Sequence, residues 1–409
     1  MKDLRVIHVN LTDFQGGAAK VAWTLMDRMN AEGHDVRIFA HDKSSNDSRV
    51  IPIPFFNIEW QQELFKQQSE RGLFDLYSAA LLRVLGDPLF AQADIVHLHC
   101  IYGGYFSFLL LPFLTAKPTV WTLHDSLAFT AGCLNTDLCS AWKDDLCAGC
   151  PMDKSDGKNP PQRVLMQSIK ESIYKIVKFT AVCPSVWLEK QAKESIMKDQ
   201  AIMMIHNGID VEVFHPGNRG KLRAKLGLPI NKKIIMSAAY GGLNNPFKGV
   251  SLLIDALKKL HDDYKDIILL NIGTYDNSVL EGLPTERIDI PFIYDSQLLS
   301  EYYAAADIFV SASTVENLSL TVCEASACGT PVVAFAVGGT PEIVVHQETG
   351  YIAKQGCSDD LACGIRYFLD DDYIRQCAGE AARKRIMDKF NARHMADEYM
   401  NLYQKMLNT

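Results

Sequence analysis

The chain has 409 residues, of which 48% are hydrophobic and 22% charged, as in soluble globular proteins large enough for two domains. Its net charge of -8 argues against a nucleic-acid partner, which would normally require a basic surface. We recognise no signal peptide and no apolar run of membrane-spanning length, so we expect a cytoplasmic protein.

The first half of the chain alternates between patterns typical of strands and of helices. Apolar runs predict strands at residues 4–10, 35–40, 94–100, 118–125 and 178–183. Helical periodicity is found at 18–32, 59–85 and 162–177. Such alternation indicates a parallel sheet that is covered by helices on both faces.

A second series of strands, at 232–240, 266–273, 306–313 and 330–336, follows a turn-rich connection at 205–217. We therefore predict an α/β protein of two facing, doubly wound, Rossmann-like domains with a cleft between them. The N-terminal domain spans 1–205 and the C-terminal domain 206–389, and the terminal helix at 390–409 packs back on the first. Ligands of such sheets bind just beyond the carboxyl ends of the strands.

The most informative stretch is 311–339, which places Glu316 and Glu324 eight residues apart around a predicted helix start. Ser319 is the expected N-cap, and Gly329 lies where a helix end favours a left-handed residue. Eight helical residues rise by roughly 12 Å, so the two acids cannot share one proton. They could hold the two ends of a nucleotide sugar, with the helix N-terminus facing its diphosphate. A solvated acidic pair is the alternative.

Three further positions follow predicted strands. Gly16 and Gly17 open a helix and allow close approach of a phosphate or sugar to the backbone. His124 could donate a hydrogen bond to substrate or act as a base. Lys248 suits a diphosphate leaving group. For each, a purely structural role is the alternative: a glycine turn, a structural histidine or a solvated lysine.

Four cysteines, Cys133, Cys139, Cys147 and Cys150, fall within eighteen residues. In a reducing compartment this spacing favours a structural zinc site with all four thiolates as ligands. Unmodified thiols and disulfides are the alternatives. A filled coordination shell would make the metal structural, not catalytic.

At these residues the chain resembles the retaining glycosyltransferases of family 4, which have the GT-B fold. The resemblance covers nearly the whole chain. Its most specific part is the E-x7-E stretch from Glu316 to Glu324 with ACGTPVVAFAVGGTPEIV, and HNGIDVEVF, PFKG, TLHD and GGA add to it. The cysteine-rich insert and CPSVWL resemble a bacterial subgroup associated with cell-surface polysaccharide synthesis.

The resemblance implies roles for the candidate residues. Glu324 would bind the ribose, and Glu316 with the backbone of Asn317 and Leu318 would hold the transferred sugar. Lys248 would neutralise the diphosphate, Gly16 and Gly17 would lie near phosphate or acceptor, and His124 would contact the donor sugar. It implies transfer with retention by front-face displacement, without a side-chain nucleophile or a catalytic metal.

Two departures from the family pattern stand out. Relatives carry an arginine in the loop before the lysine, whereas this chain reads SAAYGGLNN, and the usual E-G-F-G after the first acid is E-N-L-S. The expected function is hexosyl transfer from a nucleotide diphosphate sugar to a lipid-linked or polysaccharide acceptor. A nucleotide-sugar epimerase or hydrolase is one alternative, and a non-catalytic nucleotide-sugar-binding subunit is another.

Contact with the inner face of the membrane is a further interpretation. The apolar stretch at 73–86 and the lysines of 162–198 could lie against an anionic membrane surface. A solvated amphipathic face is the favoured alternative.

Overall fold

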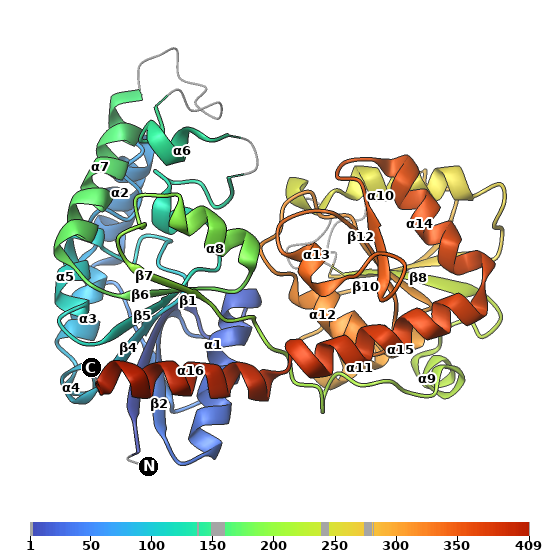
Figure 1. Cartoon of the computed structure of the whole chain (residues 1–409), viewed down its shortest axis with the longest axis horizontal. Coiled ribbons are helices and arrows are strands. Elements are labelled where there is room, and N and C mark those ends of the chain that lie inside the picture. Colours follow the sequence, from blue (N-terminus) through green and yellow to red (C-terminus); the bar gives the residue numbers. More distant parts are fainter. Residues whose placement is uncertain are drawn as a thin grey trace. The chain divides into compact units, whose positions relative to one another are not determined.

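A computed structural model describes residues 3–136, 139–148, 160–238, 245–273, 280 and 282–408. The chain divides into two compact units. The first domain comprises Met1–His206 together with Met395–Thr409, and the second comprises Asn207–His394. In the described residues each domain is built on one parallel sheet with helices packed against it (Figure 1).

The sheet of the first domain has the strand order β3-β2-β1-β4-β5-β6-β7, and every pairing is parallel. Its strands are β1 (Arg5–Thr12), β2 (Asp35–Asp42), β3 (Val50–Pro52), β4 (Ile95–Leu98), β5 (Thr119–Thr122), β6 (Thr180–Cys183) and β7 (Ala201–Met204). The central strands β1, β4 and β5 are neighbours, so their carboxyl ends lie along one edge of the sheet.

Successive side chains of a strand point to opposite faces of the sheet, so β4 contributes side chains to both faces. Val96 and Leu98 belong to the main apolar cluster of this domain, together with residues of α5 (Leu111–Leu114), α7 (Pro160–Ile176) and α8 (Val186–Lys193). His97 points to the other face, where Tyr403 of α16 (Ala392–Leu407) donates to or accepts from its Nδ1 at 2.6 Å.

The remaining helices of the first domain connect these strands. They are α1 (Gly17–Ala31), α2 (Ile58–Glu70), η1 (Ala79–Leu81), α3 (Leu82–Leu85), α4 (Pro88–Gln92), η2 (Phe108–Leu110), η3 (Leu127–Phe129) and α6 (Ala141–Asp144).

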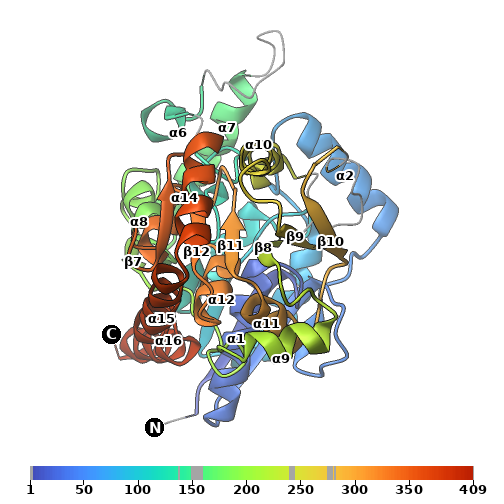
Figure 2. The same ribbon diagram turned by 90° about the vertical axis from the view of Figure 1, so that its right-hand side faces the viewer.

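The second domain has the strand order β10-β9-β8-β11-β12-β13, again entirely parallel. The strands are β8 (Lys233–Ala238), β9 (Ile267–Ile272), β10 (Glu286–Ile290), β11 (Ile308–Ser311), β12 (Val332–Phe335) and β13 (Gly350–Ala353). Figure 2 shows this sheet with helices on both sides.

Two helices, α10 (Val250–Leu260) and α14 (Ser358–Asp370), pack on one face of the second sheet and contact each other. The other face is covered by α9 (Arg219–Leu226), α11 (Ser296–Ala305), α12 (Leu320–Ala327) and α15 (Asp372–Lys389). The short elements η4 (Pro246–Lys248) and α13 (Thr340–Ile343) follow β8 and β12.

The helical pattern at 59–85 corresponds to three separate helical segments. Residues 59–85 do not form a single helix, because α2 ends at Glu70 and the chain turns at Gly72, whose φ is +68. Asp75 also has a positive φ of 54 and accepts a hydrogen bond from the backbone N–H of Gly104 at 2.7 Å. The apolar stretch at 73–86 is therefore a turn followed by the short helices η1 and α3.

No helix within the described ranges is long and apolar enough to cross a bilayer.

Candidate functional site

Three loops of the second domain meet at the carboxyl ends of its central strands. They follow β8, β11 and β12, which are neighbours in the sheet. The backbone N–H of Thr314 donates to the carbonyl of Phe247 at 2.8 Å, and that of Gly339 donates to the carbonyl of Asn317 at 2.6 Å. These bonds join the three loops around Glu316.

Glu316 and Lys248 form an ion pair, with Lys248 Nζ 2.7 Å from Glu316 Oε1. Both side chains are partly buried, at 27% exposure for the lysine and 16% for the glutamate. An ammonium has three N–H donors, so the pair leaves donors that could reach a phosphate oxygen. The structure thus brings together two residues that the sequence assigned to different parts of one ligand.

Two glycines make this arrangement sterically feasible. Gly249 has φ +59, and a Cβ atom there would lie 2.0 Å from the carbonyl oxygen of Ala312. Gly338 has φ +51, and its Cβ would lie 1.7 Å from the carbonyl oxygen of Glu316. Only glycine fits both the left-handed backbone and the close approach, so these positions fix how near the loops come to Glu316.

Helix α12 starts beside this ion pair. Its first residue is Leu320, and the first turn contains no acidic residue to offset the positive end of the helix dipole. Ser319 occupies the predicted N-cap position, but its hydroxyl lies 3.0 Å from the hydroxyl of Thr321 and does not cap a helix N–H. The N-terminal end of α12 can therefore attract an anion.

The far end of α12 confirms the prediction for Gly329. Its φ is +72, and its N–H donates to the backbone carbonyl of Ser326 at 3.1 Å. The next N–H, of Thr330, donates to Ala325 at 3.1 Å, which completes a Schellman motif.

Glu324 lies inside α12 and is almost fully buried, at 1% exposure. Its Oε2 accepts a hydrogen bond from the hydroxyl of Tyr303 in α11 at 3.0 Å. Burial and the neighbouring Glu324 hold the pKa of Tyr303 well above its usual value, so the phenol stays protonated as a donor. Sequence reasoning missed Tyr303, because it precedes Glu324 by 21 positions on a different helix.

The helical spacing between the two acids is corrected by the structure. Only the segment from Leu320 to Glu324 is helical, whereas Glu316 lies in the loop before α12. A continuous helix between the acids was therefore the wrong basis for their separation.

In the first domain, Gly16 and Gly17 lie where β1 leads into α1. Gly16 has φ +90 as the N-cap residue, and Gly17 is the first residue of the helix. A Cβ on Gly16 would meet nothing within 4 Å, so the backbone is open there. The buried Asp13 accepts hydrogen bonds from the N–H groups of Ser44 and Ser45 at 3.0 and 2.8 Å. Although burial alone would raise the pKa of Asp13, these bonds hold it below its usual value.

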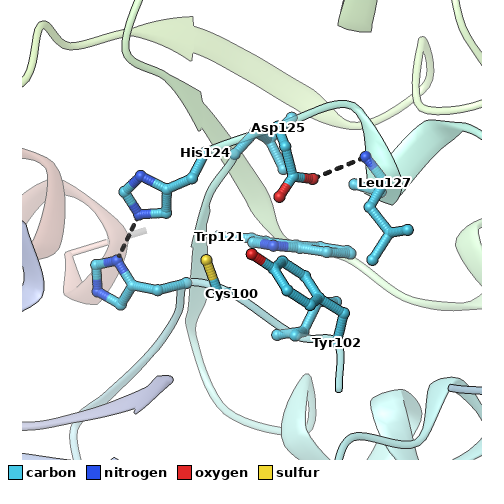
Figure 3. A pocket seen from close by; sticks show the side chains of 10 residues that line it. Cys100, Tyr102, Trp121, His124, Asp125 and Leu127 are labelled. Carbon is cyan, nitrogen blue, oxygen red and sulfur yellow. Dashed lines mark hydrogen bonds between the residues drawn. The ribbon is translucent and has the colours of Figure 1, made fainter. Parts of the chain in front are cut away.

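His124 lies two residues beyond β5 and lines a small pocket with Cys100, Tyr102 and Trp121 (Figure 3). Its Nε2 is 3.0 Å from Nδ1 of His99. Burial lowers the pKa of His124 to about 3, so its imidazole is neutral near pH 7. The neighbouring Asp125 accepts a hydrogen bond from the N–H of Leu127 at 2.8 Å, and burial raises its pKa to about 6.

The cysteine cluster is only partly described. Cys150 lies outside the described residues, while Cys147 is buried and accepts a hydrogen bond from the N–H of Ala131 at 3.4 Å. Across the residues that are described, the one group of three metal-ligating side chains is His8, His97 and His99, not the cysteines. Structural zinc at Cys133, Cys139, Cys147 and Cys150 stays a prediction.

Each domain matches a known protein family. Residues 218–385 match "Glycosyl transferases group 1", and residues 15–213 match "Glycosyltransferase Family 4". Each half of the chain is thus similar to a glycosyltransferase domain. This confirms the family resemblance at the level of the domains, whereas the subgroup stays a prediction.

Proteins similar to this chain include the D-inositol 3-phosphate glycosyltransferase of Mycobacterium bovis. It is 29% identical over 336 residues, which cover 78% of this chain and 62% of that protein. The N-acetyl-alpha-D-glucosaminyl L-malate synthase of Bacillus anthracis is 25% identical over 231 residues, or 56% of this chain and 59% of that protein. The chain thus spans less than two thirds of the length of these relatives.

Solved structures confirm the predicted fold class. The sucrose-phosphate synthase of Thermosynechococcus elongatus matches this chain with a TM-score of 0.71 at 19% identity, covering 99% of both chains. HepE of Anabaena, solved in complex with UDP-glucose, matches with a TM-score of 0.70 at 16% identity over 98% of this chain and 99% of that chain. The fold is therefore the α/β GT-B fold of two Rossmann-like domains.

Proposed function

We propose that the protein is a retaining glycosyltransferase that moves a hexosyl group from a nucleotide diphosphate sugar to a lipid-linked or polysaccharide acceptor. The observation that carries this proposal is the Lys248–Glu316 ion pair beside the N-terminus of α12, with the buried carboxylate of Glu324 inside the same helix. A cation, a helix N-terminus and two carboxylates match the diphosphate and the two hydroxyl-rich ends of such a donor.

We assign the donor to these residues as follows. Glu324, held by Tyr303, accepts hydrogen bonds from the ribose hydroxyls. Glu316 and the backbone of Asn317 and Leu318 hold the transferred sugar, and Lys248 neutralises the diphosphate. No arginine accompanies Lys248 in the sequence before it, so the dipole of α12 supplies the remaining positive potential.

In the first domain, we assign to His124 a hydrogen bond to the donor sugar and to Gly16 and Gly17 a place near phosphate or acceptor. The open space at Gly16 and the positive φ at this residue support close backbone approach.

In the proposed reaction the bond between the anomeric carbon and the phosphate oxygen breaks. The acceptor oxygen then bonds to the anomeric carbon on the same face, which retains the configuration. The acceptor proton passes to the leaving phosphate, so no side-chain nucleophile is needed. Lys248 stabilises the charge that grows on that phosphate.

The acceptor class has a second candidate. The relatives' names specify inositol 3-phosphate and malate, which are small hydroxyl-bearing anions. A soluble acceptor of that kind would require no membrane contact.

Tyr77 and Leu82, within the stretch proposed to touch the membrane, are exposed at 38% and 45%, which supports a peripheral contact with a lipid-linked acceptor.

The proposal is tested by measuring transfer from a panel of nucleotide sugars by wild type, Lys248→Ala and Glu316→Ala. Turnover should fall at least about tenfold in each variant, on the order of 1.4 kcal/mol of transition-state stabilisation. Lys265→Ala is the matched control, because Lys265 forms a similar pair with Asp262 at 3.0 Å on the exposed surface. Its turnover should equal that of wild type.

Other outcomes separate the alternatives. Donor consumption without an acceptor product would indicate an epimerase or hydrolase. A thermal shift with a nucleotide sugar but no turnover would indicate a binding subunit. Unchanged turnover in both site variants would refute the proposed site.

A further inference from the structure

The first domain contains four histidines close together on one face of its sheet. His8 in β1 is directly opposite His97 in β4, and His99 follows two positions after His97 on the same side. His124 lies beyond the end of the next strand, β5. His8, His97 and His99 are buried, whereas His124 is partly exposed at the pocket in Figure 3.

Three of these imidazoles form a continuous hydrogen-bonded chain. Nε2 of His124 lies 3.0 Å from Nδ1 of His99, and Nε2 of His99 lies 3.0 Å from Nδ1 of His8. His97 stays outside the chain, because its nitrogens bond to Thr122 Oγ1 at 2.7 Å and to Tyr403 OH at 2.6 Å. Among the described residues, Nε2 of His8 is the one buried nitrogen of these rings without a partner.

A metal ion is the competing explanation for such a group. His8, His97 and His99 each offer a nitrogen within 4.8 Å of the others. However, both nitrogens of His97 and both of His99 already have hydrogen-bond partners. A metal would have to break these bonds in a fully buried core, so the hydrogen-bonded chain is the better account.

The hydrogen-bonded chain of His8, His99 and His124 admits only two proton arrangements if every imidazole is neutral. Burial lowers the pKa of each of these histidines, to about 3 for His8, so all are neutral near pH 7. A neutral imidazole has one donor and one acceptor, so the choice at His8 fixes the choice at His99 and at His124. Either His8 donates from Nδ1 and leaves a bare Nε2, or it accepts at Nδ1 and leaves an Nε2–H without a partner.

The unpartnered nitrogen of His8 decides between the two. A buried N–H without an acceptor is rarer in proteins than an acceptor that is left unused. His8 therefore donates from Nδ1 to Nε2 of His99. His99 in turn donates from Nδ1 to Nε2 of His124. The hydrogen of His124 then resides on Nδ1.

We propose that His99, backed by His8, is a positioning residue that fixes His124 as the Nδ1–H tautomer, so that His124 is a neutral hydrogen-bond donor and not a general base. The acceptor nitrogen of His124, Nε2, is occupied by His99, so no nitrogen remains to take a proton from the acceptor substrate. This inference deepens the proposed transferase function and rests on it for its kinetic consequence. It also separates the two roles that the sequence left open for His124.

The test reads the tautomer directly. The 409-residue chain, labelled with 15N at histidine and without added ligand, is examined by long-range 1H–15N NMR at pH 7.5. His124 should show a protonated Nδ1 and a bare Nε2. The opposite tautomer, or stoichiometric metal bound at His8, His97 and His99, would overturn the proposal. Because no donor is present, this result is independent of whether transfer occurs.

Two variants then test the positioning role. His99→Phe removes the donor, and we expect a mixed tautomer of His124 with about a three- to tenfold loss of turnover, the equivalent of one hydrogen bond. His99→Asn keeps an N–H near the position of Nδ1 and should restore a single tautomer and most of the activity.

An unchanged tautomer in His99→Phe, in protein with native near-UV circular dichroism, would refute the role of His99. If His99→Phe does not fold, the tautomer of His124 in His8→Phe tests the same role. His8 is the next imidazole in the hydrogen-bonded chain after His99. If the tautomers behave as expected but no nucleotide sugar is consumed, the proposed function fails and the positioning role stands.

Discussion

At the scale of single residues, the site of the second domain depends on glycine as much as on charge. The carbonyl of Glu316 and the backbone of Gly338 approach each other so closely that a methyl group has no room. The carboxylate of Glu316 is thereby held at the ion pair with Lys248 by backbone geometry on one side and by charge on the other. A change at Gly338 should disturb both folding and donor binding.

Gly338→Ala tests this steric requirement. The substitution combines a left-handed backbone with a predicted Cβ contact of 1.7 Å, whereas Gly227→Ala has the same kind of backbone, φ +67, with nothing within 4 Å. Gly227→Ala should cost about 1–2 kcal/mol in the free energy of unfolding from backbone strain alone. Gly338→Ala should cost about 1–3 kcal/mol more from overpacking. Urea unfolding measures both, and equal costs would contradict the close approach.

The cluster of His8, His97, His99 and His124 predicts that acid destabilises the first domain. Burial lowers the pKa of His8 and of His124 to about 3, from about 6.5 in the unfolded chain. The unfolded chain thus binds more protons, so the stability contributed by these residues is present above pH 6.5 and is lost as pH falls toward 3. At pH 5.5 each such histidine lowers the free energy of unfolding by about 1.4 kcal/mol.

Two carboxyl groups act in the opposite direction. Burial raises the pKa of Asp75 and of Asp125 to about 6, so they contribute stability at low pH that is lost as pH rises through 6. Between pH 7.5 and pH 5.5, each of these carboxyl groups raises the free energy of unfolding by less than about 1 kcal/mol. The four histidines lower it by more over the same range. Unfolding of the first domain should therefore need less urea at pH 5.5 than at pH 7.5, and an equal or higher midpoint would refute the prediction.

At the scale of elements, the strands that sequence patterns predicted are the interior ones. The four that escaped prediction, β3, β7, β10 and β13, are the edges of the two sheets. Interior strands of parallel sheets are buried on both faces and read as apolar runs, as in β9, which is buried throughout. Edge strands are short and half-exposed, as in β10, so their composition resembles that of loops.

The candidate site was predictable to a similar degree. Glu316, Lys248 and Gly329 follow strands or end a helix, and local signals mark such positions. Tyr303 and the contact between Lys248 and Glu316 depend on packing between distant segments, which a single sequence does not reveal. For the buried histidines a signal existed: His97 and His99 are two positions apart, which places them on one face of a strand.

A buried carboxylate joins three elements of the second domain. Asp307, at the start of β11, accepts hydrogen bonds from Arg223 of α9 at 2.6 Å and from the N–H of Ile234 in β8 at 2.7 Å. Asp307→Ala leaves the buried guanidinium of Arg223 without its carboxylate partner and should cost about 3–5 kcal/mol in the free energy of unfolding. Asp263→Ala, which breaks a half-exposed pair with Arg366, should cost less than about 1 kcal/mol.

Thermal or urea unfolding of both variants measures the difference. Similar costs for the buried and the exposed pair would show that α9 is not anchored through Asp307.

At the scale of the whole molecule, the first domain is discontinuous in sequence. It includes Met395–Thr409, and the terminal helix supplies two buried hydroxyls to the sheet. Tyr399 OH lies 2.6 Å from Thr122 Oγ1, and Tyr403 OH lies 2.6 Å from Nδ1 of His97. Thr122 and His97 in the first sheet thus form hydrogen bonds with residues that follow the second domain in the sequence.

Tyr399→Phe combined with Tyr403→Phe should therefore destabilise the first domain and spare the second. Each lost hydroxyl removes one hydrogen bond from a buried polar group of the sheet, at a cost of about 1–3 kcal/mol. Hydrogen exchange should show faster exchange in β4 and β5 with β8 and β11 unchanged. Tyr373→Phe is the control, because Tyr373 is 76% exposed. Equal loss of protection in both domains would contradict this assignment.

The late arrival of α16 also has a consequence during synthesis on the ribosome. The residues between His206 and Met395 must be translated before the polar face of the first sheet can be covered. At about 5–20 residues per second, that interval lasts on the order of 10–40 s. During this time the nascent first domain exposes His97 and Thr122 to water, so it reaches its final stability only after α16 has been synthesised.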